Sequence, residues 1–220
     1  MPIKAVIFDM DGVIVDSEGL HREADDIILA KYGVKLNDSE WASYLGQREQ
    51  EVWAQIKKKS NLKEDAEYLR KEKDEYYLQL IDKKLRLFPG FRTFLGLVKE
   101  KNLKIALVSS SPRNQVNKIL EKFSLTNSFT LNLSGNDVAH PKPHPEPYQK
   151  TIDKLQVKPE ECIVIEDTIT GIKSAKAAGC NIVAVTNTFA AVSLEKAGAD
   201  LVVNNLEEIS ANIIALFGVL

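Results

Sequence analysis

The sequence predicts an α/β protein: a mostly parallel sheet flanked by helices, with a small α-helical domain inserted after the first strand. Short, unbroken apolar runs recur along the chain, and such runs are typical of strands buried on both faces. Amphipathic helical segments separate most of them, which is the pattern of βαβ units in a parallel sheet. Between residues 37 and 87 the strand pattern is absent, and charged helical patterns replace it.

Composition excludes several classes of protein. The 220 residues suffice for one sizeable core, or for a core with a smaller insert. With 29 basic and 31 acidic residues the net charge is -2, so no broad positive field predicts nucleic acid or a membrane as a partner. No apolar run approaches the roughly 20 residues that span a bilayer, and we expect no signal peptide.

The chain has two cysteines, Cys162 and Cys180, and each lies beside an apolar segment that resembles a strand. Isolated thiols in such settings are usually buried and inert, and the spacing does not suggest a disulfide framework. We therefore expect a cytoplasmic protein. Its balanced charge favours a monomer by default.

The first predicted strand, residues 3–8, ends in Asp9 and Asp11, and Gly12 follows at once. Open α/β sheets bind ligands at the carboxyl ends of their strands, where these two carboxylates would lie. Uncompensated buried charge is costly, and a hard cation with a phosphate beyond it would compensate the acids. The ordinary alternative is a strand that runs into an acidic turn, because Asp-Gly favours turns. This stretch alone leaves both interpretations open.

A helical insert follows the first strand. Apolar residues on one face predict a helix after Asp16, and Gly33 marks its end. Residues 38–86 contain 11 acidic and 11 basic residues, so the insert is highly charged but balanced. The turn at Phe88-Pro89-Gly90 closes it. We therefore expect a core formed by residues 1–16 and 88–220 and an insert formed by residues 17–87.

After the insert, helices and strands alternate to the end of the chain. The predicted helices are 91–101, 112–123, 148–155, one that stops at 178, and a last one that carries Ile209, Ile213, Ile214 and Leu216. The predicted strands are 104–108, 129–133, 162–165, 181–185 and an edge strand at 201–203.

Polar groups follow several of these strands. Ser109 ends the second strand, Lys142 lies in the loop after the third, and Glu166-Asp167 end the fourth. Singly, Ser109 is explained as a polar residue before a helix and Lys142 as a surface lysine. Together with Asp9 and Asp11 they would gather at one end of the sheet, which favours a functional site.

The charges of these groups suggest their roles. Asp9, Asp11 and Asp167 could offer oxygens to Mg²⁺, which usually binds carboxylates, waters and a phosphate oxygen. Lys142 would offset the acids and hold a phosphoryl oxygen.

The segment after the second strand suggests an anion site. The Ser109 hydroxyl and the backbone N–H groups of Ser110 and Ser111 could donate to the same phosphoryl group. Ser111 is a good N-cap with Pro112 at the first helical position, so a helix N-terminus would face the site. Helix N-termini bind anions readily, and the site is therefore predicted to take phosphate.

These residues resemble a known family. The segment Asp9-Met10-Asp11-Gly12-Val13, Ser109, Lys142 in a Lys-Pro setting, and Glu166-Asp167 are similar to the four motifs of the haloacid dehalogenase superfamily. The resemblance covers nearly the whole chain and is closest to the β-phosphoglucomutase-like branch. It implies a Rossmann-like phosphotransfer core, residues 1–16 and 88–220, and a helical cap, residues 17–87.

The resemblance also implies a covalent mechanism. Asp9 would attack phosphorus to give an aspartyl-phosphate, and Asp11 would serve as general acid and then as general base. Mg²⁺ would be held by Asp9, by the backbone carbonyl of Asp11, and by Glu166 and Asp167. The cation and Lys142 would stabilise charge on the transferring group. An acid two residues after the nucleophile argues against dehalogenation.

The cap would select the substrate. His21, Gly46 and Arg48 resemble residues that lie near the substrate in this branch, although Arg48 could equally be an exposed arginine at a helix start and His21 a structural hydrogen-bonding residue. The similar mutases carry lysine before that glycine, whereas this chain has Leu45. The Gly-x-Arg spacing resembles sugar-phosphate phosphatases of the same branch, which favours hydrolysis.

Three functions remain in competition. The first is a Mg²⁺-dependent phosphatase acting on a small sugar or polyol phosphate, and the second is a phosphomutase with the same core. The third is a phospho-acceptor signalling domain, which also gathers acids, a hydroxyl and a lysine around Mg²⁺. The Asp-x-Asp pattern on the first strand, the length of the chain and the helical insert argue against the third.

Overall fold

The computed structural model describes residues 2–44 and 49–209. The chain divides into two compact units, one formed by Met1–Asp16 with Arg86–Leu220 and the other by Ser17–Leu85. The segment that leaves the first unit, at Asp16, lies beside the segment that returns to it, at Arg86. The Asp16 N–H donates to the Arg86 carbonyl at 3.0 Å, and the Phe88 N–H donates to the Ile14 carbonyl at 2.9 Å.

The first unit is built on a parallel sheet, which confirms the predicted fold class. Its described residues form six strands in the order β3-β2-β1-β4-β5-β6, and every pair of neighbours is parallel. The strands are β1 (Ala5–Phe8), β2 (Lys104–Val108), β3 (Leu131–Leu133), β4 (Cys162–Glu166), β5 (Asn181–Val185) and β6 (Leu201–Val203). The first strand is central, and the chain builds the sheet outward from it on both sides, so β1 and β4 meet where the strand order reverses.

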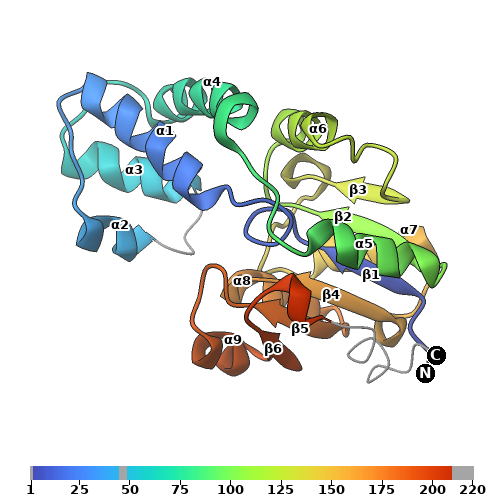
Figure 1. Cartoon of the computed structure of the whole chain (residues 1–220). Helices are drawn as coiled ribbons and strands as arrows, with labels where there is room; N and C mark the ends of the chain where they lie inside the picture. The colour runs from blue at the N-terminus through green and yellow to red at the C-terminus, as the bar shows by residue number, and fades with distance from the viewer. Residues whose placement is uncertain (1, 45–48, 210–220) are drawn as a thin grey trace. The chain divides into compact units, whose positions relative to one another are not determined.

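Helices cover both faces of this sheet (Figure 1). They are α5 (Phe91–Glu100), α6 (Arg113–Lys122), α7 (Glu146–Leu155), α8 (Ile169–Ala177) and α9 (Ala191–Ala197), with short 3₁₀ turns at Gly135–Asp137, Pro159–Glu161 and Leu206–Glu208. Ile7 of β1 belongs to a buried cluster with residues of α7 and α8, whereas Phe8 packs edge-on against Phe91 and Phe94 of α5. Adjacent residues of β1 thus enter two separate apolar layers, which explains its unbroken apolar run.

Several predicted boundaries shift by a few residues. The helix predicted at 112–123 is α6, with Pro112 as its N-cap, so the prediction that Ser111 caps it was wrong. Pro112 has an extended backbone (ψ 152°), which places it before the helix instead of in its first turn. The helix predicted from 148 begins earlier, at Glu146, and β3 is shorter than predicted. The last predicted helix lies outside the described residues, except for Ile209.

The described part of the second unit is helical. It contains α1 (Glu18–Lys31), α2 (Asp38–Tyr44), α3 (Glu49–Lys59) and α4 (Ala66–Lys84). Trp53 and Ile56 of α3 are buried with Ile28 and Leu29 of α1 and with Leu69 of α4, so the unit has a small apolar core of its own. Within the described part of the chain, no helix has the length and apolar character needed to cross a membrane.

The packing of α5 on the sheet predicts the cost of removing its aromatic contact. Phe91 is fully buried, and its ring lies 5.8 Å from that of Phe8 at 85°. Phe91→Ala should lower the free energy of unfolding by about 3–5 kcal/mol, because it removes apolar burial and leaves a cavity. Denaturant unfolding measures this change. The control Val192→Ala, at a side chain that is 59% exposed, should change stability by less than about 0.5 kcal/mol; equal losses for the two variants would contradict this packing.

Candidate active site

The carboxyl ends of β1, β2 and β4 bring the predicted site residues of the first unit together. The Asp9 N–H donates to the Ile165 carbonyl at 3.0 Å, which places Asp9 beside Glu166 and Asp167. The Ser109 N–H donates to the Leu133 carbonyl at 3.0 Å, so Ser109 continues the pairing of β2 with β3. The gathered residues are all buried: Asp9, Ser109, Lys142, Glu166 and Asp167.

Lys142 links two of the acids. Its Nζ donates to Asp9 Oδ1 at 2.5 Å, to Glu166 Oε1 at 2.7 Å and to the Val108 carbonyl at 3.1 Å. Burial alone would lower the pKa of Lys142, but the two carboxylates outweigh burial and raise it well above its usual value. The lysine therefore remains an ammonium, and its three donors are all engaged.

Glu166 is the most extensively bonded of the acids. Oε1 accepts from Lys142 and from the Tyr148 hydroxyl at 2.7 Å, and Oε2 accepts from the N–H groups of Asp167 and Thr168 and from the Thr168 hydroxyl. Burial would raise the pKa of Glu166, but Lys142 and these hydrogen bonds lower it. A carboxylate offers about four lone-pair positions, so Glu166 could bind a cation only by giving up one of these donors.

Asp167 can accept further hydrogen bonds or bind a cation. Its Oδ2 accepts from the Thr188 hydroxyl, whereas its Oδ1 is buried without a hydrogen-bond partner among the described residues. Burial, and then the charges of Glu166 and Asp9, raise the pKa of Asp167 well above its usual value. An unsatisfied buried carboxylate oxygen is costly, and a cation beside it would remove that cost.

Three carboxylates of this site could share one ion. One oxygen from each of Asp9, Glu166 and Asp167 lies within 4.8 Å of the others. Burial raises the pKa of Asp9 to about 8; Lys142 opposes this shift, and Glu166 and Asp11 add to it. The donors are all oxygens, which suits a hard cation such as Mg²⁺.

Gly12 permits a close approach at this cluster. It has φ +78°, and a Cβ at this position would lie 1.9 Å from Asp167 Oδ2. The Gly12 carbonyl accepts from Asn187 Nδ2 at 2.7 Å. Only glycine therefore allows the turn after Asp11 to lie against the Asp167 carboxylate.

The carboxylate of Asp11 contacts the serines that follow β2. Its Oδ2 accepts from Ser111 Oγ at 2.7 Å and lies 3.4 Å from Ser109 Oγ, which in turn accepts the Ser111 N–H at 3.0 Å. Ser111 thus binds Asp11 instead of capping α6. Ser110 is exposed between them. The hydroxyls of Ser109 and Ser111 hold the Asp11 carboxylate at the end of β2.

The candidate residues of the second unit are only partly described. Gly46 and Arg48, together with Leu45, lie outside the described residues. His21 stacks on Tyr77, with ring centroids 3.8 Å apart, and its Nδ1 lies 3.0 Å from Lys73 Nζ. Burial and then the charge of Lys73 lower the pKa of His21 well below its usual value, so it is neutral.

Sequence reasoning missed several partners of the site, including Thr168, whose hydroxyl binds Glu166. Thr188 binds Asp167 and Asn187 binds the Gly12 carbonyl, and both follow the end of β5. The rule that identified Asp9 and Ser109 at strand ends could therefore have found them. The Tyr148 hydroxyl donates to Glu166 from α7. In the sequence Tyr148 lies on the apolar face of a predicted helix, and that pattern predicts only packing.

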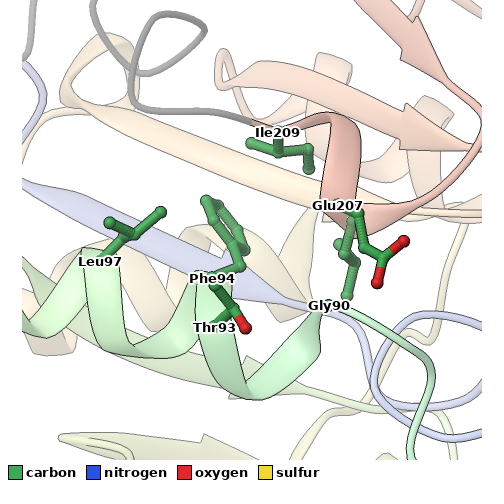
Figure 2. Close-up of a pocket in the computed structure, with 7 residues that line it drawn as sticks. Gly90, Thr93, Phe94, Leu97, Glu207 and Ile209 are labelled. Carbon is green, nitrogen blue, oxygen red and sulfur yellow. The ribbon is translucent and has the colours of Figure 1, made fainter.

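A separate pocket lies elsewhere in the first unit, between α5 and the 3₁₀ turn at Leu206–Glu208 (Figure 2). Its volume is about 270 Å³, and it contains none of the predicted site residues. Phe94, Leu97 and Ile209 give it a largely apolar lining (Figure 2). The buried acidic cluster, not this pocket, is the candidate active site.

Comparisons with known proteins find similar phosphatases and a similar phosphomutase. The phosphorylated carbohydrates phosphatase of Thermotoga maritima is 33% identical over 177 residues, which cover 80% of this chain and 82% of that protein. Hexitol phosphatase B of Escherichia coli K12 is 31% identical over 221 residues, 95% of each chain. The crystal structure of β-phosphoglucomutase from Clostridium difficile, 29% identical, superposes with a TM-score of 0.82 over 98% of this chain and 96% of that chain.

The family comparison covers most of the chain, including strands β1 to β5 and the acidic residues at their ends. The model of the haloacid dehalogenase-like hydrolases matches residues 6–185, which extend from β1 to the end of β5. The chain therefore belongs to the haloacid dehalogenase-like hydrolase family.

Proposed function

We propose that this protein is a Mg²⁺-dependent phosphatase that hydrolyses a small sugar or polyol phosphate through an aspartyl-phosphate on Asp9. The observation that carries the proposal is a cluster of three buried carboxyl groups with too little positive charge to ionise them all. Asp9, Glu166 and Asp167 are buried together, and in the described part of the chain a single buried ammonium, that of Lys142, bonds to this cluster. Burial therefore raises the pKa of Asp9 and Asp167, and a divalent cation would supply the charge that lets both ionise.

The residues that would hold the cation follow from their unused bonding capacity. Asp167 is the first candidate, because its Oδ1 atom has no hydrogen-bond partner among the described residues. Asp9 is the second, because one of its oxygens lies within 4.8 Å of oxygens of Glu166 and Asp167. The resemblance to the family adds the Asp11 backbone carbonyl, and Glu166 would contribute by exchanging one of its donors. Bound Mg²⁺ would supply the positive charge that lets phosphoryl oxygens approach these acids.

Asp9 is the proposed nucleophile. A carboxylate oxygen of Asp9 forms a bond to phosphorus while the bond from phosphorus to the ester oxygen breaks. Lys142 is bonded to Asp9 Oδ1, so it fixes that oxygen and offsets the charge of the incoming phosphoryl group. Water then attacks the aspartyl-phosphate, releases inorganic phosphate and regenerates the Asp9 carboxylate.

Asp11 is the proposed proton carrier for both steps. It donates a proton to the leaving ester oxygen in the first step and removes a proton from the attacking water in the second. Ser111 is bonded to Asp11 Oδ2, which orients the carboxyl group. The Ser109 hydroxyl and the Ser110 N–H are the proposed donors to the phosphoryl oxygens. Ser111 would join them only by exchanging its bonds to Ser109 and Asp11.

The second unit is the proposed cap, with His21, Gly46 and Arg48 near the substrate. The names of the relatives support a phosphorylated sugar or polyol as substrate, because one is a phosphorylated carbohydrates phosphatase and another a hexitol phosphatase. We further propose that the protein works as a monomer in the cytoplasm, which is consistent with its balanced charge.

A phosphomutase is the second candidate, and the 29% identity to a β-phosphoglucomutase over 98% of the chain favours it. The two activities share the phosphorylation of Asp9 and differ in the acceptor, which is water for a phosphatase and a sugar hydroxyl for a mutase. Leu45, which stands where similar mutases carry lysine, supports hydrolysis.

A substrate screen tests the choice between them. Purified protein with Mg²⁺ should release inorganic phosphate from at least one sugar or polyol phosphate, and removal of the metal with EDTA should stop the release until Mg²⁺ is restored. Isomerisation of a sugar phosphate without net release of phosphate would establish the mutase instead. Full activity in EDTA would contradict the cation site.

Asp9→Asn should reduce turnover below detection, because the amide cannot attack phosphorus. The fold should remain intact, as judged by circular dichroism, since the substitution keeps the shape of the side chain and Lys142 keeps its ion pair with Glu166. Asp153→Asn is the matched control, because Asp153 is exposed on α7, and it should retain the wild-type rate. Substantial activity in Asp9→Asn would refute the nucleophile.

Asp11→Asn should lower kcat by about 10²–10⁴-fold for an alkyl phosphate, because proton transfer is lost. The loss should be smaller for an aryl phosphate such as p-nitrophenyl phosphate, whose leaving group needs no proton. Steady-state kinetics on the two substrates measure the difference. The comparison is made in kcat/KM, which reports only the phosphorylation step, because the role of Asp11 as general base in the second step lowers kcat for both substrates. An equal loss of kcat/KM on both would mean that Asp11 acts on the fold or the metal site and not as the general acid.

A further inference from the structure

A second group of possible metal ligands lies in the loop before α7. His140, His144 and Glu146 each offer one nitrogen or oxygen atom, and these atoms lie within 4.8 Å of one another. We propose that these three residues form a binding site for a divalent transition-metal ion, of which Zn²⁺ is the best match. This site is separate from the acidic cluster, and the proposal does not depend on the hydrolytic reaction.

The side chains already face one another. His140 Nδ1 lies 2.8 Å from Glu146 Oε2, and the two imidazole rings have centroids 4.7 Å apart with their planes at 32°. His144 Nδ1 accepts the Glu146 N–H at 3.2 Å. An ion that used this nitrogen would replace a long hydrogen bond, so the rearrangement required for binding is small.

The loop orients the carboxylate of Glu146 through backbone hydrogen bonds. Glu146 Oε1 accepts the Ala139 N–H at 2.8 Å and Oε2 accepts the His140 N–H at 2.9 Å. Each oxygen accepts one backbone donor and retains further lone-pair capacity for a ligand. A metal-binding carboxylate held in this way by backbone hydrogen bonds is oriented in advance.

The position of His144 is also supported. The Ser174 hydroxyl of α8 donates to the His144 carbonyl at 2.6 Å, and the His144 N–H donates to the Pro141 carbonyl at 3.0 Å. Two prolines, Pro141 and Pro143, lie between the histidines and restrict the backbone. Little conformational entropy would therefore be lost when an ion is bound.

The donor set selects the class of metal. Two imidazoles and one carboxylate suit Zn²⁺ and its neighbours in the first transition series, whereas Mg²⁺ prefers oxygen donors. The His140 side chain is 66% exposed, so solvent can reach the ion and fill its remaining positions. The site thus has three protein ligands and room for water, an arrangement known from open zinc sites.

Lys142 stands between the two histidines in the sequence, but it belongs to the other site. Its ammonium is buried against Asp9 and Glu166, whereas the imidazoles are at the surface. Binding to the loop must therefore be measured with excess Mg²⁺ present, which keeps Zn²⁺ from the oxygen donors of the acidic cluster.

Imidazole NMR gives a direct test, because the chain contains three histidines. In tag-free protein with ¹⁵N-labelled histidine and excess Mg²⁺, one equivalent of Zn²⁺ should shift the ring nitrogens of His140 and His144. The half-buried ring of His21, in the second unit, should not move and serves as the internal control for a histidine outside the loop. Unchanged resonances for His140 and His144 would overturn the proposal.

Variants then assign the ligands. Glu146→Gln and His144→Ala should each weaken Zn²⁺ binding about tenfold or more in isothermal titration calorimetry with excess Mg²⁺. Glu160→Gln is the matched control, because it removes one exposed carboxylate from the same unit away from the loop, and it should bind Zn²⁺ as the wild type does. Equal affinity in all three variants would place the zinc elsewhere and refute the site. Thermal unfolding at the wild-type temperature in each variant shows that a loss of binding does not come from unfolding.

Discussion

The buried ion pairs of Lys142 are the interaction on which the first unit depends most. One ammonium bridges Asp9 at the end of β1 and Glu166 at the end of β4, and it also binds the carbonyl at the end of β2. Breaking a buried pair by removing one partner leaves an uncompensated charge and typically costs 3–5 kcal/mol. The same lysine thus holds three strand ends together and offsets the charge of the proposed nucleophile.

The sheet order places these groups together. Because β1 is central and the chain extends from it in both directions, strands that are distant in sequence end at the same edge. Asp9 and Asp167 meet across the β1–β4 pairing, while the serines after β2 reach Asp11 from the opposite side. The central position of β1 therefore lets Asp9 face the acids of β4 while the carboxylate of Asp11 faces the serines after β2.

Much of this site could be predicted because its residues sit at strand ends, a position that an apolar run followed by a polar residue reveals. Asp9, Ser109 and Glu166 are of this kind. Tyr148 could not be predicted, since its hydroxyl reaches Glu166 from a helix whose pattern indicates only packing. The prediction for Ser111 was wrong because it weighed local capping preference, whereas the hydroxyl is used in a contact with Asp11, 100 residues earlier in the chain.

The sequence by itself determined the α/β class, the helical insert and the strand-end residues proposed to carry the chemistry, because hydrophobic periodicity and strand-end polarity are local properties. Tertiary structure decided which ion pairs and hydrogen bonds those residues form. It paired Lys142 with two acids, filled the lone pairs of Glu166 and left one Asp167 oxygen without a partner among the described residues. It also brought His140, His144 and Glu146 within reach of one ion. Hydrogen-bond partners depend on distances between side chains, and only the folded chain sets those distances.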